Sequence, residues 1–134
     1  MNRSRTRGDV PSEVEELLTG ELVVAHLATC ADNRPHSAPL WYRYEDGVVE
    51  ILTTGVKLAN IRKNPNVSIS MEQDHDGIPE WMVTIRGTAT IIEDEDEIRK
   101  ANTRINRKYG VEDDAWSENV LVHIDVGSVA YRTY

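Results

Sequence analysis

Extended apolar segments dominate this sequence, and no regular alternation of strand and helix connects them. Six segments have the composition of strands: residues 22–29, 35–44, 48–54, 67–72, 81–92 and 120–131. Helical patterns occur only before the first of them, over 57–63 and over 93–108. Parallel strands each need a crossover connection, usually a helix. The order therefore favours a mainly β fold, an antiparallel barrel with a few helices, over a doubly wound sheet.

The interior must be built largely from aliphatic side chains. Apolar residues make up 40% of the 134 residues, and none of them is Phe. A core of Val, Ile and Leu suits strands, where branched side chains pack well on a pleated surface. The length fits one domain. We expect residues 11–134 to form it and residues 1–10 to be a flexible tail.

Local signals refine this outline. Ser12 and Glu15 have the spacing of a capping box at the start of the first helix. Residues 45–47, Glu-Asp-Gly, predict a hairpin turn, and Gly87 predicts a bulge inside the long strand over 81–92. The charged helix over 93–108 has apolar residues at spacings of three and four, which predicts one buried side: Ile98, Ala101 and Ile105.

The charge argues against polyanionic partners. The formal net charge is −8, so the surface repels nucleic acid and anionic lipid, and we expect neither as a partner. The first ten residues lack the apolar core of a signal peptide, and no apolar run reaches membrane-spanning length. We expect a cytoplasmic protein. Cys30 is the only cysteine, and no metal-binding spacing occurs, so we expect no metal site.

The corner after the third strand has the chemistry of a phosphate site. Thr53 and Thr54 offer hydroxyls, Gly55 allows close approach, and Lys57 lies in the first turn of a helix, where free N–H groups point outward. The Walker spacing is absent, so a mononucleotide-sized phosphate is the natural ligand. A simple strand–turn–helix corner with an exposed lysine explains these residues equally well.

The second strand is the other candidate for ligand contact. Pro39 cannot donate a hydrogen bond to a sheet, so backbone there is free to face a planar ligand, or the strand is an edge strand. His36 is placed to reach such a ligand. Trp81 and Trp116 either pack in the interior or stack at a ligand or subunit interface. No nucleophile elbow or catalytic acid–base pair is evident, so the catalytic residues are unknown.

Together these residues resemble a known family. VVAHLATCADNRPHSAPLWYRYEDGVVEILTTGVKLANIRKNPNVSISM is similar to the pyridoxamine 5′-phosphate oxidase-like split barrels, with their Leu-Ala-Thr, Arg-Pro-His, Thr-Thr, Lys and Asn-Pro in the same order. The run Val83-x-Ile85-x-Gly87-x-Ala89 before an acidic helix continues the likeness. The resemblance implies a six-stranded antiparallel Greek-key split barrel that forms a homodimer and holds FMN between its subunits.

The resemblance also implies roles for particular positions. Thr53, Thr54 and Lys57 would hold the phosphate. Trp81 and Met82 fall where the second subunit reaches toward the flavin. Backbone groups along the second strand would border the isoalloxazine ring: Ser37, Ala38, Pro39, Leu40 and Trp41.

Two differences from the usual family sequence restrict the functions that we expect. The loop from Thr54 to Lys57 is short, so either phosphate binding is weaker than in the family or Arg62 or Lys63 completes the site. The C-terminal VGSVAYRTY lacks the Arg-Leu-x-Pro ending of true pyridoxamine phosphate oxidases, so oxidation of that vitamin is not expected. The leading hypothesis is an FMN-binding oxidoreductase acting on a small molecule. The alternatives are a deazaflavin-dependent reductase of the same fold and a non-catalytic flavin or haem carrier.

Overall fold

A computed structural model describes residues 9–134, so the first eight residues of the expected tail lie outside the described part. The chain is mainly β, as expected. Its elements are α1 (Ser12–Gly20), β1 (Ala25–Ala31), β2 (Arg34–Leu40), β3 (Arg43–Glu45), β4 (Val48–Thr53), α2 (Gly55–Lys63), β5 (Asn66–His75), β6 (Ile78–Ile92), α3 (Glu95–Lys108) and β7 (Val120–Thr133).

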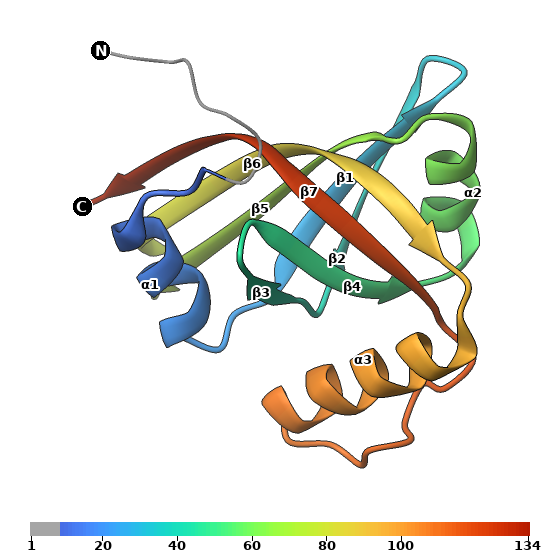
Figure 1. The fold of residues 1–134 in the computed structure, drawn as a ribbon. Helices are drawn as coiled ribbons and strands as arrows, with labels where there is room; N and C mark the ends of the chain where they lie inside the picture. The colour runs from blue at the N-terminus through green and yellow to red at the C-terminus, as the bar shows by residue number, and fades with distance from the viewer. Residues whose placement is uncertain (1–8) are drawn as a thin grey trace.

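The strands form one coiled antiparallel sheet in the order β2-β1-β5-β6-β7-β4-β3. Figure 1 shows the long strands β5, β6 and β7 curving across the molecule, with α1 and α2 at opposite ends and α3 lying below β4. The two end strands of the sheet, β2 and β3, are consecutive in sequence. The sheet therefore curls back on itself through a covalent link, without a hydrogen-bonded seam at that point.

The predicted number of six strands is wrong, because the segment over 35–44 divides in two. Residues 34–40 pair with β1, whereas residues 43–45 pair with β4. Trp41 and Tyr42 carry the chain from one edge to the other. Tyr42 is fully buried, and its hydroxyl donates to the Leu18 carbonyl at 2.7 Å. Lys108 Nζ donates to the Tyr42 carbonyl at 2.7 Å, so this link is held from both sides.

The barrel interior follows the two-residue period of its strands. Alternate residues of β6 are buried, from Trp81 through Val83 and Ile85 to Ala89. A register shift between Arg86 and Gly87 lies at the position expected for a bulge, but the extra, unmatched residue is Gly127 of β7 and not a residue of β6. A Cβ built on Gly87 would lie 2.4 Å from the Asp125 carbonyl oxygen. Only glycine allows β6 and β7 to approach this closely.

Helix α3 is stabilised at both ends. The Asp94 side chain accepts a hydrogen bond from the Glu97 N–H at 3.0 Å. Acidic residues occupy its first turn and basic residues its last, an arrangement that complements the helix dipole. Ala101 and Ile105 are buried as predicted, whereas Ile98 is only half-buried.

The predicted capping box of α1 is wrong. Pro11 occupies the N-cap position, and no side chain caps the helix. Ser12 lies inside the first turn. The Glu15 carboxylate is engaged elsewhere, because it accepts a hydrogen bond from the Tyr44 hydroxyl at 2.7 Å. That bond ties α1 to β3 across the end of the barrel.

A buried carboxylate joins α3 to the sheet. The Glu50 side chain is 4% exposed and lies on the face of β4 opposite to Val49 and Ile51. Three basic side chains from different elements reach it: Arg43 of β3 at 3.0 Å, Arg104 of α3 at 2.8 Å and His123 of β7 at 3.0 Å. Burial alone raises the pKa of Glu50, but the hydrogen bonds from Arg104, His123 and Arg43 outweigh it, so the pKa lies below its ordinary value.

We expect Glu50→Gln to destabilise the protein by about 2 kcal/mol at neutral pH, the scale of a hydrogen bond to a charged group. The loss stays below the roughly 3–5 kcal/mol of a fully buried pair, because both arginines keep contact with water. Since the folded-state pKa is lowered, this stability is complete above the ordinary value of about 4.3 and disappears as the pH falls through the folded-state pKa. Denaturant unfolding of both proteins between pH 7 and pH 3 measures the difference. A difference that stays constant over this range would contradict the assignment.

Residues 9–134 contain neither a membrane-spanning helix nor a cluster of metal-ligating side chains. No helix there has the length and apolar character needed to cross a bilayer. Nor do three or more His, Cys, Asp or Glu side chains in that range come together as a metal site.

Candidate functional site

The place where the sheet closes by a covalent link leaves strand backbone without a neighbouring strand. β2 pairs only with β1. β4 pairs with β7 along its whole length, but β3 covers its other edge only at residues 48–50. Leu40 at the end of β2 and Leu52 of β4 line one cavity, so the two uncovered edges lie close together. We call the space between β2, β4 and the start of α2 the split.

Prolines set the polarity of the β2 edge. Pro35 and Pro39 have no N–H and can occupy only positions whose nitrogen faces away from β1. Backbone groups of alternate residues in a strand point to the same side. The N–H of Ser37, midway between the prolines, therefore also points toward the split. This edge offers one donor among several carbonyl acceptors, and its place at the end of the sheet confirms the edge strand that Pro39 suggested.

His36 contributes a buried polar atom without a partner. The residue pairs with Thr29 across the β1–β2 ladder, next to the contact of Thr29 with Asn60 of α2. Its Nδ1 is buried and makes no hydrogen bond within the described residues. A buried unpaired nitrogen costs free energy. A ligand that donates to it or accepts from it would remove that cost.

The corner between β4 and α2 contains the predicted residues, but its two threonines differ in exposure and in hydrogen bonding. Thr53 is buried, and its hydroxyl makes only a long contact, 3.4 Å, to the Thr54 carbonyl. Thr54 is exposed at the N-cap of α2, and its side chain caps none of the first N–H groups. Gly55 has a φ of 69°, a conformation that favours glycine. The structure thus leaves the helix start open to an anion.

Lys57 supplies the positive charge at this corner. It lies in the first turn of α2 and is half-buried. Within residues 9–134 no carboxylate forms an ion pair with it. Arg62 and Lys63 lie in the last turn, where Arg62 faces Glu93 at 3.8 Å and Lys63 faces Asp32 at 3.1 Å. Lys57 is therefore the cation placed to meet a phosphate at the open end of the helix.

Trp81 and Met82, which the family resemblance places near a second subunit, lie on opposite faces of β6. Trp81 is 4% exposed, and its Nε1 donates to Gln73 at 3.0 Å, so the ring belongs to the core of its own chain. Met82 points outward and is 40% exposed. Its sulfur accepts a hydrogen bond from the Tyr134 hydroxyl at 3.4 Å. Of these two residues, only Met82 has its side chain exposed on the outer face of β6.

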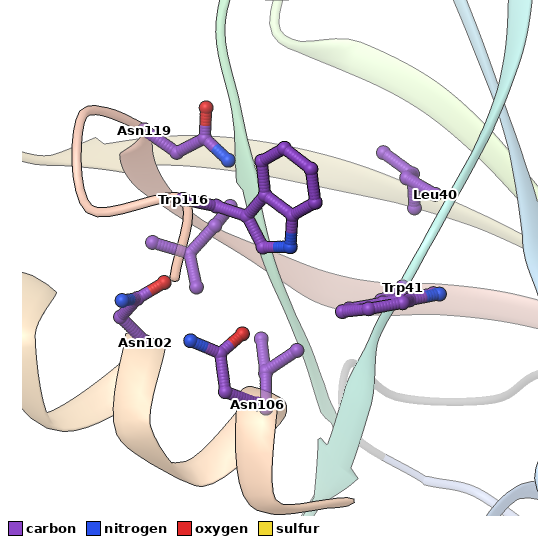
Figure 2. A pocket seen from close by; sticks show the side chains of 8 residues that line it. Leu40, Trp41, Asn102, Asn106, Trp116 and Asn119 are labelled. Carbon is purple, nitrogen blue, oxygen red and sulfur yellow. The ribbon is translucent and has the colours of Figure 1, made fainter. Parts of the chain in front are cut away.

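A cavity of about 230 Å³ adjoins the split. Figure 2 shows it between the end of β2, helix α3 and the segment that leads into β7. Its lining residues are Leu40, Trp41, Leu52, Asn102, Ile105, Asn106, Trp116 and Asn119. Sequence reasoning had singled out Leu40 and Trp41 as site residues but missed the asparagines. The apolar pattern over 93–108 does not reveal them, although Asn102 and Asn106 repeat at a spacing of four on one side of the helix.

These groups fit a flat molecule that carries a phosphate. Lys57 and the open start of α2 suit the anion, and the free edge of β2 with the unpaired His36 nitrogen suits a polar planar ring. The residues that would hold such a cofactor are His36, the β2 backbone from Ser37 to Trp41, Thr54 and Lys57.

Comparisons with known proteins show that other chains share this fold. An FAD-binding protein from Mesorhizobium loti shares 24% identity, with 94% of this chain and 96% of that chain covered and a TM-score of 0.76. A putative pyridoxamine 5′-phosphate oxidase from Listeria innocua shares 17% identity over 90% and 95% of the two chains, with a TM-score of 0.73. A structure described as an F420 reductase shares 25% identity over 87% and 94%, with a TM-score of 0.68.

No protein with curated annotation matches the sequence. The sequence profile of the pyridoxamine 5′-phosphate oxidase family, by contrast, matches residues 11–133, almost the whole described chain. Because this match spans nearly all of the residues that the structure describes, the chain belongs to the pyridoxamine 5′-phosphate oxidase family.

Proposed function

We propose that this protein is a cytoplasmic FMN-binding oxidoreductase that works as a homodimer, with a flavin between the subunits at the split of each chain. The main support for this proposal is Lys57. This lysine is half-buried, has no carboxylate partner among the described residues, and lies at the uncapped start of α2. Membership of the family and likeness to an FAD-binding protein support a flavin as the cofactor. A corner with this one lysine at a helix start suits FMN, whose single phosphate is terminal.

Each part of the site has a defined task. Lys57 and the first N–H groups of α2 bind the phosphate. The Ser37 N–H and the neighbouring carbonyls orient the ring along β2, and the buried His36 nitrogen takes one further hydrogen bond. When bound, FMN supplies hydride or electron transfer, and the chain supplies binding, orientation and shelter from water. No side chain is assigned as a catalytic acid or base.

The absorbance spectrum of the freshly purified protein tests the cofactor directly. Bound oxidised FMN gives two bands in the near-ultraviolet and visible range, whereas a deazaflavin gives one main band. The deazaflavin is the second candidate, because the F420 reductase resembles this chain over most of both lengths. A Soret band would instead indicate haem. A colourless protein that also fails to bind added FMN would refute the proposal.

Lys57→Ala should weaken FMN binding by about 1.5–3 kcal/mol, the range for a hydrogen bond to a charged group. Fluorescence titration of FMN into the flavin-free protein measures the change. The matched control is Lys63→Ala, at the other end of the same helix and 65% exposed. That variant should bind FMN as the wild type does. Equal losses in the two variants would show that Lys57 acts only through net charge.

Met82→Glu should dissociate the homodimer, because it places a charge on an outward-facing apolar side chain of β6 where the family's second subunit is expected. Light scattering after size exclusion should give twice the chain mass for the wild type and the single chain mass for the variant. FMN affinity should fall in parallel, since each flavin lies between subunits. A monomeric wild type that binds FMN normally would refute the dimer.

A further inference from the structure

The cavity beside the split has a chemical character that the phosphate corner does not share. All eight lining residues are uncharged, and they comprise two tryptophans, three asparagines and three aliphatic residues. The charged parts of the proposed cofactor site, Lys57 and the helix start, are not among them. What the cavity can bind must therefore follow from its own rings and amides.

The Trp41 ring is a fixed platform. Tyr109 stacks on it with ring centroids 4.6 Å apart and an interplanar angle of 4°. The Tyr109 hydroxyl donates to the Val23 carbonyl at 2.6 Å, which fixes the tyrosine in turn. Since one face of Trp41 is covered by Tyr109, the other is left to the cavity. Figure 2 shows the ring edge-on with Trp116 across the space from it.

Two buried amides have their orientation forced by their surroundings. Asn102 and Asn106 of α3 are 5% and 1% exposed. Each Nδ2 donates to the backbone carbonyls of Asp113 and Ala115, at distances between 2.8 and 3.4 Å. Carbonyls accept only from donors, so the amide nitrogens must face that loop. The amide oxygens then face the other way.

The two amide oxygens are unused acceptors at the cavity. Neither makes a hydrogen bond among the described residues, and Figure 2 shows the Asn106 oxygen directed into the space in front of Trp41. The indole N–H of Trp116 also points into this space. Trp116 is 58% exposed and has a φ of 59°, a conformation uncommon for a bulky residue. The site thus presents two acceptors and one donor between aromatic walls.

Size and charge restrict the occupant further. A volume of about 230 Å³ lies below the range of roughly 300–1,000 Å³ for drug-sized ligands, so one small ring system fills it. A charged group would lose water there and gain no opposite charge. An aromatic ring with an N–H donor would stack on Trp41 and satisfy the asparagine oxygens.

We propose that this cavity binds an uncharged planar heterocycle bearing an amide or ring N–H. Because Leu40 ends the strand proposed to border the flavin and Trp41 follows it directly, the heterocycle would lie next to the cofactor as its small-molecule reaction partner. That role rests on the proposed function. The existence of the site does not.

The test uses a matched pair of probes, nicotinamide and nicotinate, which differ in a neutral amide against a carboxylate on the same ring. Ligand-detected NMR titration of flavin-free protein should show nicotinamide binding about tenfold tighter than nicotinate, since burying an unpaired charge is costly. Trp116→Ala should weaken nicotinamide binding at least fivefold. Trp116→Phe, which keeps a ring but removes the N–H, should weaken nicotinamide binding less than Trp116→Ala does. Ile78→Ala, 70% exposed at the far turn, is the control and should change nothing.

The remaining outcomes separate this inference from the cofactor proposal. If nicotinamide still binds when FMN is saturating, the cavity is a separate subsite, as proposed. If FMN displaces nicotinamide, the cavity belongs to the cofactor site, and the proposal of a separate heterocycle site is overturned. Equal affinity for both probes, no binding, or an unchanged Trp116→Ala would also overturn it. If FMN fails to bind while nicotinamide behaves as expected, the flavin proposal falls and this one stands.

Discussion

Everything at the candidate site depends on how the two end strands of the sheet are joined. β2 and β3 are connected by only Trp41 and Tyr42, yet they pair with strands at opposite ends of the sheet. The chain thus brings two edges together without letting them form a ladder. Uncovered backbone polar groups must find partners or water. A split lined with such groups is a consequence of chain connectivity.

Helix α3 contacts both the link between β2 and β3 and the loop that carries Trp116, through two rows of residues. Arg104 and Lys108, four residues apart, reach Glu50 and the Tyr42 carbonyl, and so hold the helix and the strand link to each other. Burial, assisted by nearby Arg43, lowers the pKa of Lys108 to about 8. Asn102 and Asn106 form the second row and fix the loop that carries Trp116. The same helix therefore contributes both to the stability of the fold and to the shape of the cavity.

Periodicity and turn chemistry predicted much of the fold. The strands and the helix after Gly55 depend on local residue patterns, which a sequence displays. Gly87 marks the place of the register shift, but the extra residue lies on β7. The break at Trp41–Tyr42 was missed because both halves of that segment are extended, and only tertiary pairing separates them. Trp81 shows the same limit. Whether a strand tryptophan faces inward depends on register, which the preceding loop did not reveal.

The candidate site was predictable where single residues carry the chemistry. Thr54, Gly55 and Lys57 form the corner that their types indicate, and Pro39 does mark an edge strand. Glu50 and the asparagines of α3 were not predicted, because their roles arise from partners far away in sequence. A polar residue inside an apolar strand or on the buried side of a helix is the signal that could have found them.

The two prolines of β2 have a consequence for the protein at high concentration. An uncovered strand edge is ordinarily a template on which another chain can add a strand, the first step toward fibres. Pro35 and Pro39 remove two of the donors that such an addition needs, so an incoming strand would find a ladder interrupted at every fourth residue. A small molecule needs only one or two bonds. The same edge can thus accept a ligand while discouraging self-association into aggregates.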